Sequence, residues 1–259
     1  MDPWGKTIDG GDSWEVVDLP VSTFFLDVEF ISPEIGFCVG LSGTILKTID
    51  SGETWVEKDS DCDRTLANIQ FPTPDVGYAV SRGYNWSFIK STDGSETCVN
   101  DTIEPAVGYG NLEAIYFTSE NVGVIGSWYI AGLVKTADGG DSWSNVAPDY
   151  PGNDIISIDF PSTDLGYALG FSGAIFKSVD GGDSWEFDTV IEDFSPNRLF
   201  FVSNDIGFAV GANGKLFKFT DPSATISEDV LELTVQIFPN PAQDHIIIKV
   251  SEKLIGANY

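Results

Sequence analysis

Short apolar runs separated by Gly, Pro, Asp and Ser recur along most of the chain, which is the pattern of strands in all-β proteins. No window shows the spacing of an amphipathic helix. One apolar phrase recurs, in which a Phe is followed by a short polar stretch, a Gly and further apolar residues. Its copies are Phe30 with Gly36–Gly40, Phe71 with Gly77–Val80, Phe117 with Gly123–Gly126, Phe160 with Gly166–Gly170, and Phe201 with Gly207–Gly211. The pattern predicts a repeated all-β architecture.

A polar turn follows four of these phrases, and another copy stands near the start of the chain. The copies span Lys6–Trp14, Lys47–Trp55, Lys90–Cys98, Lys135–Trp143 and Lys177–Trp185, and the third is decayed. Their central aspartates lie 41, 43, 45 and 42 residues apart. A period of about 40–45 residues is typical of propeller blades. We therefore expect units of four strands, A to D, with the polar turn between strands C and D.

The residue types of the turn suit a hairpin. A short carboxylate can accept backbone N–H groups of its own turn, Gly adopts positive φ without steric cost, and Trp offers a large apolar face for packing. We expect these residues to hold the turns rather than to carry catalysis. They are Asp9, Trp14, Asp50, Trp55, Asp93, Asp138, Trp143, Asp180 and Trp185.

The turn resembles the Asp-box, or bacterial neuraminidase repeat. Together with the apolar phrase, it is similar to the photosystem II assembly factor type of β-propeller over about residues 4–221. The resemblance implies an all-β propeller of four-stranded blades, with the boxes on the face opposite the ligand site.

The number of blades follows from the complete units, which span about 26–58, 66–100, 112–147 and 155–190. A fifth unit begins at Leu199 but has no box after Lys218, whereas the chain starts with a box and a strand D at Ser13–Val17. The simplest closure places this N-terminal strand beside the last strand C, which gives five closed blades without an exposed edge. The alternative is that these units form part of a larger ring with more blades.

Composition narrows the partners. The net charge of −27 disfavours nucleic acid and anionic membranes as partners.

The sequence contains no run of about 20 apolar residues, so no membrane span is predicted. No signal peptide is visible at the N-terminus, and we expect a monomer. Cys38 fits a core strand, while a bridge between Cys62 and Cys98 remains open.

No cofactor is expected. A zinc site has no support, since His245 is the only histidine. The spacing of Asp59, Asp61 and Asp63 suggests calcium, but an EF-hand would need Gly and Glu where Arg64 and Gln70 stand. An irregular calcium site there remains an alternative.

The tail carries a second specific phrase. After a polar linker at 222–234, the segment 235–259 includes Phe238-Pro239-Asn240-Pro241-Ala242 followed by alternating apolar residues. It resembles the start of the C-terminal sorting domain of type IX secretion substrates, truncated at Tyr259. The resemblance implies type IX secretion machinery as a partner, and an extracellular or outer-membrane surface location in a Gram-negative, Bacteroidota-type bacterium. An ordinary two-strand extension is the alternative.

The expected ligand face carries the B–C and D–A loops. In two adjacent units the B–C loop holds aromatic residues instead of a plain Gly-x-x-Gly, and exposed aromatic side chains suit sugar rings or peptide side chains. The candidate ligand-binding residues are Tyr84, Trp86, Trp128, Tyr129, Asp61, Arg64 and Tyr109. The alternative is that the tryptophans fold back over their own blades.

These observations favour a secreted or cell-surface, non-catalytic propeller that binds a glycan or a protein. The alternative is a glycoside hydrolase, because some Asp-box propellers are glycosidases. A sialidase needs three converging arginines, and the chain has only Arg64, Arg82 and Arg198 in total. A carboxylate pair such as Asp61 and Asp149 is conceivable, but nothing selects it. The photosystem-type assembly role relies on an Arg-rich face, which the net charge argues against.

Overall fold

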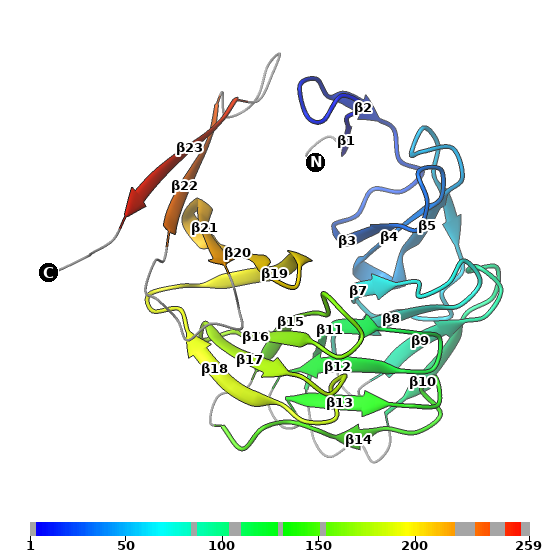
Figure 1. Cartoon of the computed structure of the whole chain (residues 1–259). Coiled ribbons are helices and arrows are strands. Elements are labelled where there is room, and N and C mark those ends of the chain that lie inside the picture. The colour runs from blue at the N-terminus through cyan, green and yellow to red at the C-terminus, as the bar shows by residue number, and fades with distance from the viewer. Residues whose placement is uncertain are drawn as a thin grey trace, which may run out of the picture.

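The structure, a computed structural model, describes residues 4–83, 87–103, 110–128, 132–150, 154–220, 231–238 and 247–254. It is an all-β propeller whose antiparallel sheets follow one another around an arc (Figure 1). Each repeat of the sequence forms one blade, so the predicted fold class is confirmed. Among the described residues, no helix is long and apolar enough to cross a membrane.

Four blades have four strands each, in the order A to D from the centre outward. The first consists of β3 (Phe25–Phe30), β4 (Gly36–Gly40), β5 (Ile45–Thr48) and β6 (Val56–Lys58). The second consists of β7 (Leu66–Gln70), β8 (Gly77–Ser81), β9 (Ser87–Ser91) and β10 (Val99–Thr102). The third consists of β11 (Leu112–Phe117), β12 (Gly123–Ser127), β13 (Leu133–Thr136) and β14 (Ser144–Asn145). The fourth consists of β15 (Ile155–Asp159), β16 (Gly166–Gly170), β17 (Ala174–Ser178) and β18 (Glu186–Val190).

The fifth blade and the N-terminus correct the expected closure. The fifth sheet consists of β19 (Pro196–Ser203), β20 (Ile206–Gly211), β21 (Lys215–Thr220), β22 (Leu231–Phe238) and β23 (Ile247–Leu254). Two 3₁₀ turns, η1 (Leu41–Gly43) and η2 (Ala212–Gly214), connect strands B and C in the first and fifth blades. At the N-terminus, β1 (Trp4–Lys6) and β2 (Glu15–Val17) pair with each other and form the N-terminal hairpin.

The N-terminal strand was expected beside the last strand C, but β22 takes that edge, with Lys215 opposite Thr234. The prediction of closure by the N-terminal strand is therefore wrong. The physical reason is the length of the connection: β22 reaches β21 through a short segment, whereas β2 would close a loop of almost the whole described chain. Figure 1 shows the N-terminal hairpin and the fifth sheet at the two ends of the arc.

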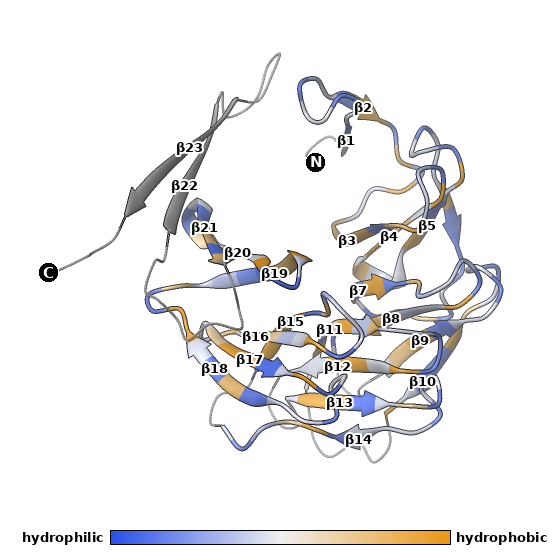
Figure 2. Ribbon diagram, viewed as in Figure 1, coloured by the Kyte–Doolittle hydropathy of each residue, from blue (hydrophilic) through white to orange (hydrophobic). Residues whose placement is uncertain are grey.

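The recurring apolar phrase builds the interface between blades. The Phe that follows strand A stacks on the strand-B aromatic of the preceding blade, with ring centroids 3.9 Å apart for Phe37 and Phe71 and 3.8 Å apart for Tyr78 and Phe117. The other side of Phe71 lies on Gly77, where an added Cβ would come within 2.3 Å of the ring. The phrase therefore pairs Phe with Gly because the ring occupies the space of a side chain. Figure 2 shows hydrophobic residues along strands A and B of the blades, for example on β7 and β8.

Two faces of the ring are distinguished by backbone hydrogen bonds. On one face the C–D turns bond to the A–B turns of the same blade, as Gly94 N to Asp75 O at 2.8 Å and Gly181 N to Asp164 O at 2.9 Å. We call this the box face. On the other face the B–C loops bond to the D–A loops, as Arg82 N does to Thr65 O at 2.8 Å. We call this the loop face.

Candidate functional site

The boxes are self-contained turns. Asp50 Oδ1 accepts a hydrogen bond from Thr54 N at 2.9 Å, Oδ2 accepts one from Thr54 Oγ1 at 2.6 Å, and Thr48 Oγ1 donates to Oδ1 at 2.8 Å. The hydrogen bonds from the Thr54 side chain and backbone, and from Thr48, lower the pKa of Asp50 to about 2. The same arrangement holds Asp9, Asp93, Asp138 and Asp180. These carboxylates are therefore occupied by their own turns.

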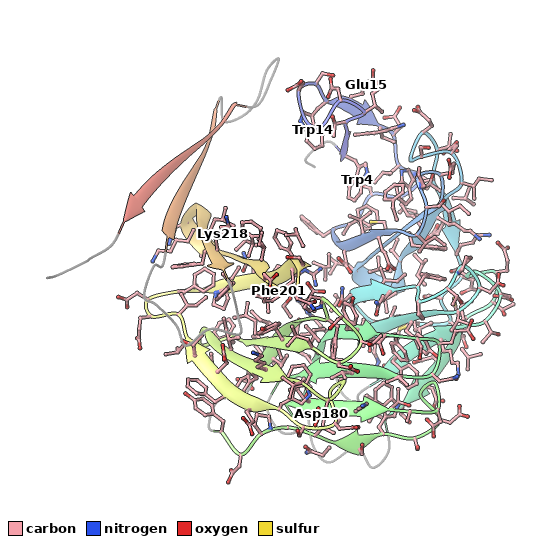
Figure 3. The ribbon with its side chains drawn as sticks, in the orientation of Figure 1. Trp4, Trp14, Glu15, Asp180, Phe201 and Lys218 are labelled. Carbon is pink, nitrogen blue, oxygen red and sulfur yellow. The ribbon has the colours of Figure 1, made fainter. Side chains whose placement is uncertain are left out.

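The box tryptophans differ in their burial. Trp55 and Trp185 are buried, and Trp143 packs against the core between the second and third blades. Trp14, on the N-terminal hairpin (Figure 3), remains 49% exposed.

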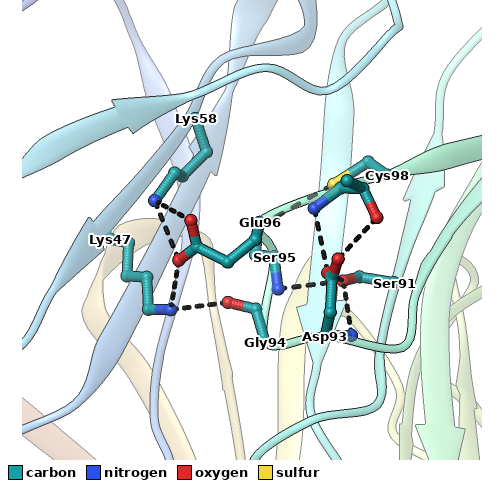
Figure 4. A network of polar contacts seen from close by, with 9 residues as sticks. Lys47, Lys58, Ser91, Asp93, Gly94, Ser95, Glu96 and Cys98 are labelled. Atoms are coloured by element: carbon teal, nitrogen blue, oxygen red, sulfur yellow. Dashed lines mark hydrogen bonds and ion pairs between the residues drawn. The ribbon is translucent and has the colours of Figure 1, made fainter.

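The boxes of the four complete blades also bond to a lysine of the unit that precedes each of them. Figure 4 shows Lys47 Nζ donating to Gly94 O at 2.6 Å and to Glu96 Oε1 at 3.2 Å, while Lys58 Nζ reaches Glu96 Oε2 at 2.8 Å. The equivalent ion pairs are Lys6 with Glu53, Lys90 with Asp141, and Lys135 with Asp183. Because its lysines and many of its acids join neighbouring blades, the box face is structural, which leaves the loop face as the candidate binding surface.

Loops of the second and third blades are joined on the loop face. Arg82 binds Glu113 through Nε and Nη2, at 2.9 and 2.7 Å from Oε2. The Glu113 side chain is only 7% exposed, so the arginine neutralises a buried carboxylate. Beside this pair, Asn111 Oδ1 accepts a hydrogen bond from Gly83 N at 2.9 Å, and Asn111 O accepts one from Trp128 N at 2.9 Å. The loops are thus held in fixed positions.

An aromatic pair extends this cluster to the fourth blade. Trp128 packs edge-on against Phe171, with ring centroids 5.3 Å apart and planes at 63°. Phe171 donates its backbone N–H to Asp154 O at 2.8 Å, yet its side chain is 54% exposed. We call the surface formed by Arg64, Arg82, Glu113, Trp128 and Phe171 the loop-face patch.

The predicted ligand residues are only partly described. Trp128 and Arg64 belong to the patch, since Gly83 lies beside the Arg64 guanidinium, where an added Cβ would be 3.5 Å from Nη1. Asp61 is exposed at φ 51° and accompanies Asp59, whose Oδ1 accepts the Asp61 N–H at 3.0 Å. The remaining predicted residues lie outside the described part of the chain: Tyr84, Trp86, Tyr109 and Tyr129.

Three members of the patch are not among the predicted ligand residues: Arg82, Glu113 and Phe171. Phe171 occupies a Gly-x-x-Gly loop, and its aromatic ring distinguishes this loop from those of two other blades, in which Leu41 and Ala212 stand at the corresponding position. Glu113 interrupts the apolar strand β11 with a charge, a signal that could have pointed to a paired arginine.

Other candidate chemistries receive little support from the geometry. Arg198 Nη2 binds Asp27 Oδ1 at 2.6 Å, so Arg198 and Arg82 both bind carboxylates of the protein itself. A convergent arginine triad for a substrate carboxylate is therefore not formed.

The cysteines and acids of the loops were candidates for a disulfide and a metal site. Cys62 and Cys98 are free thiols, so the disulfide considered between them is not formed. Within the described segments, no three His, Cys, Asp or Glu side chains are grouped as a metal site would require.

Comparison with known proteins identifies relatives of this fold. The family model described as Photosynthesis system II assembly factor YCF48 matches residues 8–65 and 149–220, half of the chain. No curated protein matches the chain. A solved structure of YCF48 bound to D1 peptide is 20% identical, with a TM-score of 0.65 over 85% of this chain and 70% of that one.

YCF48 from Cyanidioschyzon merolae is 18% identical, with a TM-score of 0.67 over 87% of this chain and 78% of that one. The GH74 xyloglucanase from Xanthomonas campestris is 15% identical, with a TM-score of 0.66 over 98% of this chain but only 47% of that one. Such identities show a shared fold.

Proposed function

This chain belongs to the Photosynthesis system II assembly factor YCF48 family, and we propose that it is a non-catalytic propeller that binds a polypeptide through the loop-face patch. The observation that carries the proposal is the exposed Phe171 ring against Trp128, beside the ion pair of Arg82 with the buried Glu113. Exposed aromatic rings on a rigid support are typical centres of protein interfaces.

The support of the patch is as important as the rings. The loops of three blades are tied by backbone hydrogen bonds at Arg82, Trp128 and Phe171, so binding need not order them. The Arg82 side chain is 43% exposed and can donate further hydrogen bonds to backbone carbonyls of a bound segment. The net charge of −27 favours a neutral or basic segment over an acidic one.

The solved structure of a YCF48 bound to D1 peptide supports a peptide rather than a catalytic substrate for this fold. The similarity to a GH74 xyloglucanase leaves a glycan as the second candidate ligand, because aromatic rings also stack on sugars.

A matched pair of variants tests the site. Peptide-display libraries and glycan arrays are to be screened with the wild-type chain, with Phe171→Ser and with Ile49→Ser. Ile49 is 71% exposed but lies in a box on the opposite face, so it controls for the loss of an exposed apolar side chain. We expect selected basic or neutral peptides to bind about tenfold more weakly to Phe171→Ser, and unchanged to Ile49→Ser. Exclusive binding of glycans, or equal peptide binding by both variants, would contradict the proposal.

We further propose that the chain is secreted by type IX machinery through its C-terminal segment. β22 and β23 pair as a hairpin on either side of the Pro-Asn-Pro phrase. Fusing residues 222–259 to a periplasmic reporter in a Bacteroidota-type host tests this role. Export of the reporter that depends on the type IX machinery is expected, and retention in the periplasm would refute it.

A further inference from the structure

The first blade exposes an apolar surface that is buried in the other complete blades. Val28 and Phe30 on β3 are 47% and 48% exposed. Their counterparts on β7 and directly after it, Ile69 and Phe71, are 5% and 7% exposed. The difference arises because the first blade covers Ile69 and Phe71, whereas no complete blade covers β3.

Comparison with the other blades shows which contact Phe30 lacks. Phe71 and Phe117 each stack on a strand-B aromatic of the preceding blade. Phe30 has its own Gly36 beneath it and the edge of Trp55 beside it, but no described residue stacks on its other face. At the other end of the arc, Phe208 on β20 occupies the strand-B position and stacks within its own sheet on Phe200 instead.

In the described part of the chain, backbone N–H groups of strand A in the first blade also lack partners that the equivalent groups of the second blade have. Ile69 N donates to Asp27 Oδ2 at 3.0 Å, and Phe71 N donates to Glu29 Oε2 at 2.7 Å. Side chains of strand A in the first blade thus accept hydrogen bonds from backbone N–H groups at strand A of the second blade. Among the described residues, no such side chain caps the N–H groups of Val28 and Phe30. Uncapped strand N–H groups beside an apolar surface are suited to binding another strand.

The N-terminal hairpin occupies the outer half of a blade at this position. The hairpin's Lys6 pairs with Glu53 as the strand-C lysines of complete blades pair with the next box. Trp4, labelled in Figure 3, belongs to this hairpin. Its ring packs on Phe25 and Trp55, with centroids 5.2 and 6.2 Å away. Within the described chain β1 pairs only with β2, so the edge at which a strand B would bind is open.

We propose that this surface, the seam formed by Val28, Phe30 and the open edge of β1, binds a β-hairpin from a segment outside residues 1–259. The hairpin has the A–B pattern of the repeats: polar side chains at two alternating strand-A positions, a Phe, and then Gly followed by an aromatic residue. Its polar side chains cap the Val28 and Phe30 N–H groups, its aromatic ring stacks on Phe30, and its second strand pairs with β1. It completes the half-blade that begins with the N-terminal hairpin.

Continuity with the interfaces between the blades supports this occupant, because the same contacts recur along the ring. The chain's own C-terminal hairpin is engaged elsewhere, since β22 pairs with β21 over Leu231 to Thr234. The bound strand A would displace the ion pair between Arg198 and Asp27, which now spans the two ends of the arc.

A synthetic peptide with the sequence of residues 66–82, which contains the A–B hairpin of the second blade, is the probe. Fluorescence anisotropy of the labelled peptide with the full chain is expected to show saturable, one-to-one binding. A peptide with Tyr78→Ser is expected to bind about tenfold more weakly, and the chain variant Phe30→Ser should weaken the original peptide to a similar degree. Ile49→Ser, on the same blade but outside the seam, should bind normally.

The peptide variant keeps the test decisive even if Phe30→Ser disturbs the fold. Absence of saturable binding, or equal binding of the two peptides, would overturn the proposal. Binding that appears only after residues 231–259 are removed would make the chain's own tail the occupant, and a dimer broken by Phe30→Ser would make it a second copy. Either result would also overturn it.

Discussion

Glu29 offers a sharp test of the contacts between inner strands. Its Oε2 accepts the Phe71 N–H at 2.7 Å, and burial raises the pKa of the carboxyl to about 7. In the next blade Gln70 occupies the same position, and its Oε1 accepts the Phe117 N–H. Replacing Glu29 by Gln therefore keeps the acceptor and removes the charge.

The sign and size of the effect follow from linkage. Because the folded-state pKa lies above the ordinary value of 4.5, the folded protein holds this proton more tightly, and wild-type stability falls as the pH rises from 4.5 to about 7. One pKa unit is worth about 1.4 kcal/mol, so the buried carboxylate costs about 3 kcal/mol at pH 8. Glu29→Gln should raise the free energy of unfolding by about this amount at pH 8, and by less than about 0.5 kcal/mol at pH 4.5.

Urea unfolding followed by tryptophan fluorescence at the two pH values measures both quantities. Glu57→Gln, an exposed residue of the same blade, controls for the change in net charge. The reverse change, Gln70→Glu, should destabilise the protein at pH 8 and much less at pH 4.5. An equal effect of Glu29→Gln at both pH values, or no gain at pH 8, would refute burial as the cause.

Further predictions concern the packing, the boxes and the ring. Gly77→Ala, which drives a Cβ into a phenylalanine ring, should cost about 1–3 kcal/mol in urea unfolding, whereas Gly170→Ala, with its nearest contact at 3.4 Å, should cost less. Thr48→Val, which leaves the buried Gly52 N–H without its acceptor, should cost about 1–3 kcal/mol; an unchanged urea midpoint would exclude this role. Arg198→Ala should cost about 1 kcal/mol, less in high salt; salt independence would argue against the ion pair. Because the pKa of Asp50 is about 2, the box contribution is complete above about pH 4 and is lost as the pH falls through 2, so the melting temperature should drop over that interval.

Much of the blade could be predicted from the sequence because its determinants are local. A box turn is closed by residues within a single segment, as Asp50 and Thr54 are, so the pattern of residue types is enough to identify it. The Phe and Gly of the apolar phrase also belong to one hairpin, since Phe71 lies on Gly77. Repetition at a fixed period then gives the propeller.

The candidate site was harder to predict because its members come from different blades. Phe171 and Trp128 meet only when the third and fourth blades pack, and Arg82 meets Glu113 across two blades. No sequence spacing encodes these contacts, since they depend on how the loops of neighbouring sheets are placed. Of the predicted residues that the structure describes, Trp128 and Arg64 lie in the loop-face patch, and both stand out in the sequence because unusual loop residues are visible in a single repeat.

The sequence by itself determined the strands, the boxes and the repeated blade, because each depends on hydrogen bonds and packing within a few tens of residues. Only the tertiary structure decided which strand completes the fifth sheet, since β22 and the N-terminal strand compete for one edge and the shorter connection prevails. It likewise decided that the first blade exposes Val28 and Phe30, because burial of a blade surface depends on the neighbour that packs against it.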